Sequence, residues 1–139
     1  MFKRKDLTHL RAWLHEAGRK PLLLRGARQV GKSSLVKKLA EDEHRHLVEI
    51  NFETQTLPSL KHETIQIDLV LKEIELLMGR KFNTEKDLLF FDEIQKSSNA
   101  LASLRYFYEK YPAIPIIAAG SLLDFLLQNE NISVPVGRI

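Results

Sequence analysis

Apolar residues along the chain follow two periodicities, one helical and one extended. In four segments an apolar residue recurs every three or four positions, and glycine, proline or polar residues mark the ends. Four shorter segments, three between these and one after the last, are rich in apolar residues, as buried strands are. We therefore predict helices over residues 6–17, 32–43, 65–79 and 97–111, and strands over residues 21–25, 46–52, 88–91 and 114–119. Residues 51–62, which include Pro58, are expected to be mostly loop, and residues 121–128 fit a further short helix.

The order of these elements predicts an α/β fold with a parallel sheet. Strands that are apolar at every position are covered on both faces, and strands separated by helices need parallel crossovers. We therefore expect helices on both faces of one sheet. Ligands in such sheets bind at the carboxyl ends of the strands. The positions to examine therefore follow Arg25, Asn51, Phe91 and Ala119.

Composition narrows the classes of protein that fit. The chain has 139 residues, which is one domain's length and enough to bury a sizeable core. Its apolar runs are far too short to span a bilayer, and the first sixteen residues mix charge in a way that secretion signals do not. There are no cysteines, which excludes disulfides and thiolate metal sites. We expect a cytoplasmic protein without a membrane partner.

The charge is distributed unevenly along the chain. Residues 1–45 carry a net charge of +7, whereas residues 46–139 carry −4. A basic half is typical of proteins that bind nucleic acid. A solvated basic face together with a phosphate site explains the same charge, and we favour this second interpretation over nucleic acid.

A glycine-rich segment between the first predicted strand and the second predicted helix matches the pattern G-x-x-x-x-G-K-[ST] in full. Chance gives on the order of one such match per few hundred chains of this length. The match also lies between a strand and a helix, as phosphate binding requires. The segment predicts a nucleotide-phosphate loop, formed by Gly26, Ala27, Arg28, Gln29, Val30, Gly31, Lys32 and Ser33.

Each fixed position of this loop has a physical reason. Consecutive backbone N–H groups can surround a polyphosphate where glycines permit the turn, and Gly31 opens a helix whose first N–H groups point at the anion. We expect Lys32, exposed in the mouth of the loop, to supply a positive charge to the β- and γ-phosphates. The Ser33 hydroxyl is placed to bind Mg²⁺. Ser34 is a weaker candidate, expected to face the neighbouring backbone.

Two acidic residues end the third predicted strand. Asp92 and Glu93 follow four consecutive apolar residues, and a buried pair of like charges is costly unless it has a use. We expect Asp92 to hold Mg²⁺ through water and Glu93 to act as the base that deprotonates an attacking water. The alternative is a solvated acidic turn without a function, and the phosphate loop upstream makes that alternative less favoured.

Two further strand ends carry polar residues. Ser121 follows Gly120 after the fourth predicted strand, where it could contact the γ-phosphate or the water, or simply cap the next helix. Asn51 ends the second predicted strand, where it could hydrogen-bond Glu93 or form a local Asx turn. The residues alone leave both pairs of alternatives open.

The segments "RGARQVGKSSL", "LLFFDEIQ" and "AAGSLLDF" together resemble the prokaryotic AAA+-type P-loop ATPases in which an N-terminal ATPase module precedes a C-terminal domain. The resemblance covers nearly the whole chain. It implies a Walker A motif at residues 26–33, a Walker B motif at Asp92 and Glu93, and a sensor near Ser121. It also implies that Asn51 contacts Glu93, and that Arg138 is a finger supplied to a neighbouring subunit of a homo-oligomer.

The resemblance also implies that relatives continue through a fifth strand and a helical lid. We therefore expect residues 1–139 to be a single, partial ATPase domain, with an N-terminal helix in residues 1–20 and the nucleotide-binding core in residues 21–139. The expected function is Mg²⁺-dependent ATP hydrolysis with Glu93 as the base, at a low rate in this chain alone. The alternatives are a P-loop kinase and a nucleotide-gated module that binds nucleic acid or protein.

Overall fold

The computed structural model describes residues 4–24 and 29–120. The described residues form four strands in one sheet, in the order β1-β4-β3-β2, and every neighbouring pair is parallel. The elements in chain order are α1 (Arg4–Leu14), β1 (Leu22–Leu24), α2 (Gln29–Asp42), β2 (His46–Asn51), the 3-10 helix η1 (Pro58–Lys61), α3 (Ile67–Met78), β3 (Asp87–Asp92), the 3-10 helix η2 (Ile94–Lys96), α4 (Ser98–Lys110) and β4 (Ile116–Ala119).

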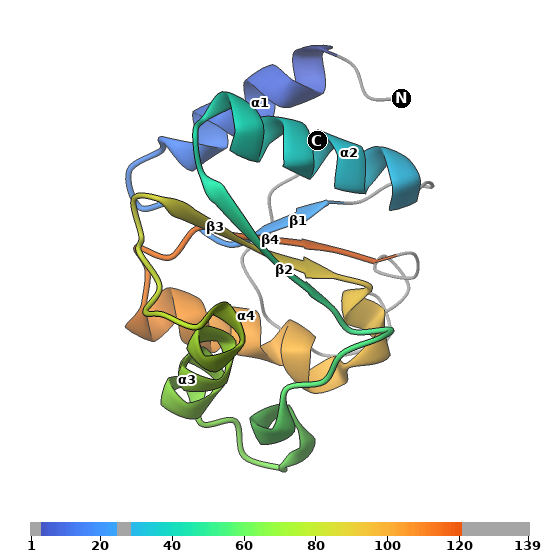
Figure 1. Ribbon diagram of the computed structural model, residues 1–139, viewed down its shortest axis with the longest axis vertical. Coiled ribbons are helices and arrows are strands. Elements are labelled where there is room, and N and C mark those ends of the chain that lie inside the picture. Colours follow the sequence, from blue (N-terminus) through green and yellow to red (C-terminus); the bar gives the residue numbers. More distant parts are fainter. Residues whose placement is uncertain (1–3, 25–28, 121–139) are drawn as a thin grey trace.

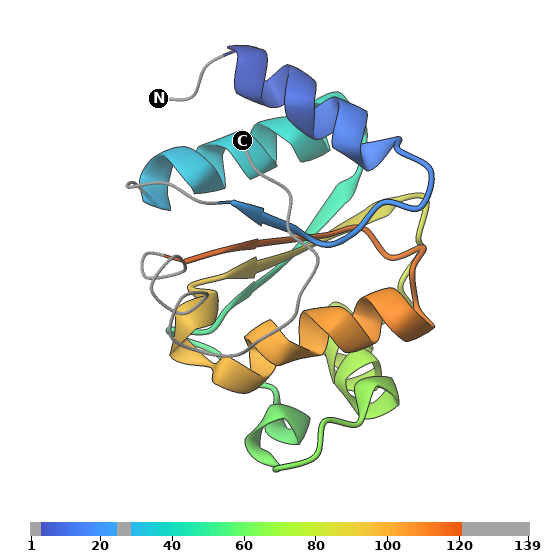
Figure 2. The ribbon, with the colours of Figure 1, turned by 180° about the vertical axis from the view of Figure 1, so that it is seen from behind.

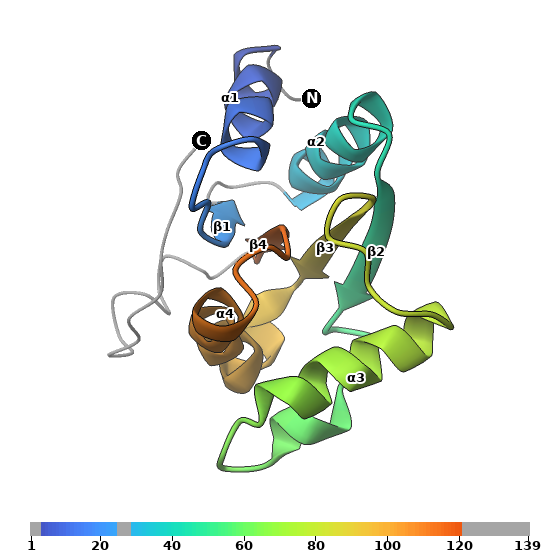
Figure 3. The same ribbon diagram turned by 90° about the vertical axis from the view of Figure 1, so that its left-hand side faces the viewer.

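Helices cover both faces of this sheet (Figure 1). Helices α1 and α2 pack on one face, and α3 and α4 pack on the other, as the edge-on view shows (Figure 3). Side chains that alternate along β3 feed the two cores: Leu88 and Phe90 belong to the α1–α2 cluster, and Leu89 and Phe91 belong to the α3–α4 cluster. This confirms the predicted parallel sheet with helices on both faces.

The predicted elements all form, with shifted ends. Strand β3 includes both Asp87 and Asp92, although only the apolar residues between them were predicted to be a strand. Helix α2 begins at Gln29, three residues before the predicted start, so Gly31 lies inside its first turn. The loop over residues 51–62 contains η1. The helix predicted over residues 121–128 lies outside the described residues.

Local chemistry fixes the ends of two helices. The Ser97 side chain accepts a hydrogen bond from the backbone N–H of Ala100 (3.1 Å) and so caps the start of α4. Gly79 ends α3 in the left-handed conformation, with φ of 77°, which glycine adopts without steric cost. These caps fix where α3 ends and where α4 begins, on either side of β3 in the chain.

The parallel order gathers the carboxyl ends of all four strands at one edge. Figures 1 and 2 show the four arrowheads pointing to that edge, with the N-terminus of α2 beside them. Strands β1 and β2 are the outer strands of the described sheet. Among the residues that the structure describes, no helix combines the length and the apolar character needed to cross a membrane. The carboxyl edge is the place where the sequence predicts a site.

Candidate functional site

Helix α2 brings Lys32 to the carboxyl edge. Lys32 is in the first turn of α2, where backbone N–H groups have no partner inside the helix. Its Nζ atom lies 3.5 Å from the carbonyl oxygen of Gly120, the residue after β4. The expectation that Lys32 is exposed was wrong, because only 8% of the residue is accessible. The first turn of α2 lies against the sheet, so the aliphatic stem is covered and the ammonium reaches the strand end.

The next residue faces strand β3. The Ser33 hydroxyl donates a hydrogen bond to Asp92 Oδ2 at 3.3 Å. Asp92 is the last residue of β3 and is 7% exposed. A hydroxyl and a carboxylate oxygen are the donors that Mg²⁺ takes from proteins, which usually supply one or two such groups and leave the rest to water and phosphate. The pair therefore fits a magnesium ion.

The Asp92 carboxylate is in an environment that resists ionisation. Burial raises its pKa, and the neighbouring Glu93 carboxylate adds to that effect, while the Glu93 backbone N–H, Ser33 and Lys32 act in the opposite direction. No lysine, arginine or histidine within the described ranges forms an ion pair with Asp92 inside 4.0 Å. A cation placed beside Asp92 would therefore relieve an unfavourable charge.

Glu93 directly follows Asp92 and is held in a strained backbone conformation. Its φ is 52°, in the left-handed region that non-glycine residues rarely adopt. Its backbone N–H donates to Asp92 Oδ1 at 2.9 Å, and its Oε1 accepts a hydrogen bond from Gln95 Nε2 at 2.7 Å. Only 7% of Glu93 is exposed. The turn thus points two carboxylates, one after the other, into the same edge.

Asn51 lies beside this pair but makes local contacts. It is opposite Asp92 in the register between β2 and β3. Its Oδ1 accepts from the backbone N–H of Glu53 at 2.9 Å, and its own backbone N–H donates to Gln55 Oε1 at 3.1 Å. This is the Asx turn that the sequence left as an alternative. In the described part of the chain, Glu93 is hydrogen-bonded by Gln95, and the expected bond from Asn51 is not formed.

Gln95 is the contact that sequence reasoning missed. It lies within the "LLFFDEIQ" segment, in which the sequence motif predicts roles only for the two acidic residues. The signal that was present is its spacing: two residues after Glu93, a long amide can fold back onto that carboxylate across a tight turn. In the structure the turn is η2, which begins at Ile94.

Some of the remaining predicted positions lie in α2, and the others lie outside the described residues. A Cβ built on Gly31 would meet no described atom within 4 Å, so there is open space beside its Cα. Ser34 is exposed, and Gln29 and Val30 contribute backbone to the first turn of α2. The other predicted positions lie outside the described residues: Gly26, Ala27, Arg28, Ser121 and Arg138.

Together these residues place a cation, a hydroxyl and two carboxylates beside a helix N-terminus. Lys32 and Ser33 come from α2, and Asp92 and Glu93 come from the end of β3. Unpaired N–H groups and a lysine attract anions such as phosphates, whereas the carboxylates suit a metal ion and a proton acceptor. The edge therefore carries complementary groups for a metal-bound polyphosphate.

A family model described as the AAA domain matches residues 18–139, which include every element from β1 to β4. A comparison with curated proteins gives no match. The matched family is one of P-loop ATPases, and the parallel sheet found here is the core on which such ATPases are built. The chain belongs to the AAA domain family.

Proposed function

We propose that this chain binds ATP with Mg²⁺ at the carboxyl edge of its sheet and hydrolyses the γ-phosphate. The observation that carries the proposal is the contact between α2 and β3, where Ser33 Oγ lies 3.3 Å from Asp92 Oδ2. This contact joins the phosphate-loop pattern to the acidic strand end, although the two are 59 residues apart in sequence. In Mg-ATP the metal ion is bound to the phosphates, so the phosphate site and the metal site must be adjacent. The Ser33–Asp92 contact makes them adjacent.

The phosphates are bound, in this proposal, by α2 and the loop before it. The first N–H groups of α2 and the positive end of its dipole attract the anion. Lys32 lies in that turn with its ammonium at the end of β4, and we assign it the role of binding a phosphate oxygen. We assign the same role to the backbone of residues 26–31, since the sequence pattern places it around the phosphates.

The metal is held, in this proposal, by Ser33 directly and by Asp92 through water. Bound Mg²⁺ would neutralise charge on the phosphate oxygens. Asp92 is buried next to Glu93, so its ionised carboxylate is more stable with a cation beside it than without one. Magnesium dependence then follows from the protein's own charge distribution.

Glu93 is the proposed general base. It accepts a proton from a water molecule while the water oxygen attacks the γ-phosphorus, and the terminal bridging P–O bond breaks to release ADP and phosphate. The left-handed turn at Glu93 places its carboxylate directly after Asp92, at the edge where the metal and phosphates are proposed to bind. Ser121 near the γ-phosphate and Arg138 as a finger between subunits remain part of the proposal.

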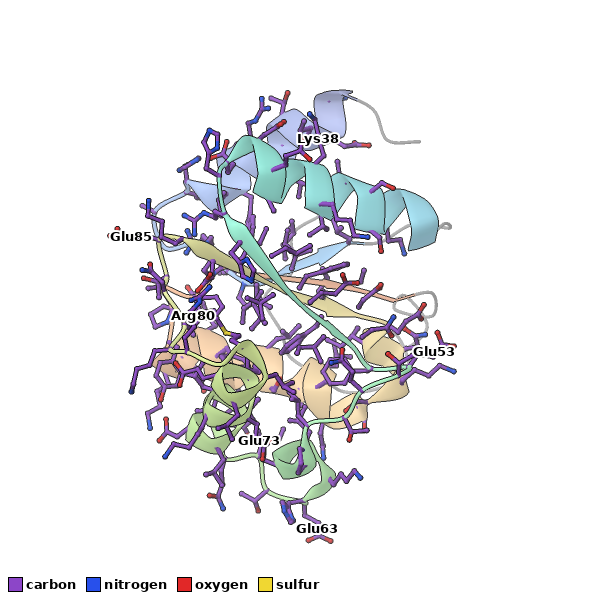
Figure 4. All side chains as sticks on the ribbon, viewed as in Figure 1. Lys38, Glu53, Glu63, Glu73, Arg80 and Glu85 are labelled. Atoms are coloured by element: carbon purple, nitrogen blue, oxygen red, sulfur yellow. The ribbon has the colours of Figure 1, made fainter. Side chains whose placement is uncertain are left out.

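The test compares two glutamate substitutions at the same edge. Glu93→Gln keeps the size of the side chain but cannot take a proton, so phosphate release should fall by about a hundredfold or more while ATP affinity is kept. Glu53→Gln is the matched control, because Glu53 is exposed and lies at the same edge of the sheet (Figure 4). Phosphate release under single-turnover conditions and titration calorimetry with Mg-ATP give the two readings. A Glu93→Gln protein that hydrolyses ATP at the wild-type rate would contradict the proposal.

A further inference from the structure

Gln95 stands between the proposed base and the end of strand β4. Its Nε2 donates a hydrogen bond of 2.7 Å to Glu93 Oε1. Its Oε1 is buried, and its amide group packs on Gly120, the first residue after β4. One side chain of η2 thus contacts the Glu93 carboxylate at one atom and the neighbouring strand end at another.

Gly120 leaves the space that this arrangement needs. A Cβ built on Gly120 would lie 2.3 Å from Gln95 Oε1, closer than real Cβ atoms come to other atoms, and 3.3 Å from the backbone nitrogen of Gln95. The φ of Gly120 is outside the left-handed region, so its backbone conformation does not itself require glycine. Among the described residues, the contact with Gln95 is therefore what leaves no room for a Cβ here.

The Glu93 carboxylate needs such a restraint. The backbone of Glu93 is fixed by its N–H bond to Asp92 and by its carbonyl, which accepts from the Lys96 backbone N–H at 3.0 Å. These bonds act on the backbone, and the Glu93 carboxylate itself accepts its hydrogen bond from Gln95. A base displaced by about 1 Å can lose on the order of a hundredfold in rate, so a donor that fixes the carboxylate matters for turnover.

We propose that Gln95 is a positioning residue that holds the Glu93 carboxylate, and that Gly120 is glycine in order to admit the Gln95 amide. The inference rests on the proposed function, because it gives Gln95 its role through Glu93. The carbonyl oxygen of Gly120 also lies 3.5 Å from Lys32 Nζ. The end of β4 is therefore in contact with both the proposed phosphate lysine and the holder of the proposed base.

The first experiment removes the donor and keeps the shape. Gln95→Met has nearly the same length as glutamine but cannot donate to Glu93. We expect kcat for ATP hydrolysis to fall by about ten- to a hundredfold, with the Kd for Mg-ATP within about threefold of wild type and an unchanged Tm. The control is Gln66→Met, the same substitution at an exposed residue that precedes α3 and whose side chain does not cap that helix. It should leave kcat unchanged.

The second experiment is a double-mutant cycle between Gly120 and Gln95. Gly120→Ala alone should lower kcat about as far as Gln95→Met, because the new methyl group displaces the Gln95 amide. In a Gln95→Ala background the amide is gone and only the 3.3 Å approach to the backbone nitrogen of residue 95 remains, which a shift of a few tenths of an ångström relieves, so adding Gly120→Ala should change kcat by less than about twofold. Non-additivity of this kind arises from the contact itself and not from a general loss of stability.

Several results would overturn the inference. They are a Gln95→Met protein with wild-type kcat, a kcat loss that comes with an equal loss of Mg-ATP affinity or a fall in Tm, and additive effects of Gly120→Ala and Gln95→Ala. These outcomes are distinct from failure of the proposed function. If wild type releases no more phosphate than Glu93→Gln, the hydrolysis proposal fails; if wild type hydrolyses ATP and Gln95→Met matches it, only the role of Gln95 fails.

Discussion

Asp87 and Asp92 are the first and last residues of the same strand, β3, and both carboxylates are buried. The amino edge of the sheet surrounds Asp87 with hydrogen-bond donors, whereas the carboxyl edge leaves Asp92 beside a second carboxylate. Figure 4 shows the two edges on opposite sides of the molecule, with Arg80 and Glu85 at one and Glu53 at the other. The comparison separates a charge that stabilises the fold from a charge that is available to a ligand.

Asp87 accepts three charge-assisted or backbone hydrogen bonds. Arg80 Nη1 and Nη2 donate to its two oxygens at 2.8 and 2.6 Å, and the backbone N–H of Asn83 donates at 2.8 Å. Burial alone opposes ionisation of Asp87, but the bonds from Arg80 and Asn83 outweigh it and hold the pKa of this carboxyl below its usual value. The ion pair ties the turn after α3 to the start of β3.

Asp92 has fewer partners, and one of them is adaptable. It accepts from the backbone N–H of Glu93 and from the hydroxyl of Ser33, which can rotate. Its pKa is raised, chiefly by burial. A buried charge without a cation costs free energy. The Asp92 carboxylate at the carboxyl edge is therefore better explained by a bound metal ion than by a role in the stability of the fold. The pKa shifts of Asp87 and Asp92 have opposite directions, which agrees with a structural role for Asp87 and with the proposed metal role for Asp92.

The sharpest way to test this comparison is to make the same substitution at both ends. Asp87→Asn should destabilise the chain by about 3 kcal/mol, because an amide nitrogen would face donors from Arg80 and Asn83 and leave the guanidinium without its partner. Urea unfolding in the absence of nucleotide measures the loss. A change of less than about 0.5 kcal/mol would mean that the Arg80–Asp87 pair contributes little to the fold.

Acid should diminish the difference between wild type and Asp87→Asn. The pKa of Asp87 in the folded chain lies below the 3.8 of an unperturbed aspartate, so its stabilising effect is complete above that value and is lost as the pH falls through the folded pKa. The gap in unfolding free energy should therefore be constant above about pH 5 and narrow toward pH 3. A gap that widens with acid would contradict the lowered pKa.

Asp92→Asn should have the opposite and smaller effect. The amide removes a buried charge next to Glu93, keeps an acceptor for the Glu93 N–H and can donate to Ser33 Oγ. We expect the unliganded chain to gain about 1 kcal/mol at neutral pH while the Mg²⁺ dependence of ATP binding weakens. Urea unfolding and calorimetry at several magnesium concentrations check the two parts. Destabilisation as large as that of Asp87→Asn would place Asp92 among the structural charges.

Much of the fold follows from patterns that are local in sequence. Because helices cover both faces of the sheet, the strands are apolar runs and the helices have apolar stripes, and these patterns predict both. The phosphate-loop pattern predicts Lys32 and Ser33, because phosphate binding needs consecutive residues. The burial of Lys32 could not be predicted, since it depends on how α2 sits over β4. The Arg80–Asp87 pair and the Gln95–Gly120 contact depend on tertiary packing, and neither leaves a periodic signal.

Start positions of elements were also less predictable than their existence. Glycine at position 31 suggested that the second helix starts there, yet nothing at Gln29 or Val30 opposes helical backbone and α2 begins earlier. At Asn51 two alternatives of similar weight fit the sequence, and only the position of the Glu53 N–H selects the Asx turn. Such choices are made by single hydrogen bonds, which composition and spacing do not determine.

The most direct test of the central claim is the thermal stabilisation of the chain by Mg-ATP. Wild type should gain about 2.7 kcal/mol at a ligand concentration one hundred times Kd, by mass action. Lys32→Ala should gain almost nothing over its own unliganded form, whereas Lys38→Ala, on the exposed side of the same helix (Figure 4), should gain as much as wild type. An equal gain for Lys32→Ala and wild type would contradict a nucleotide site at the carboxyl edge of this sheet.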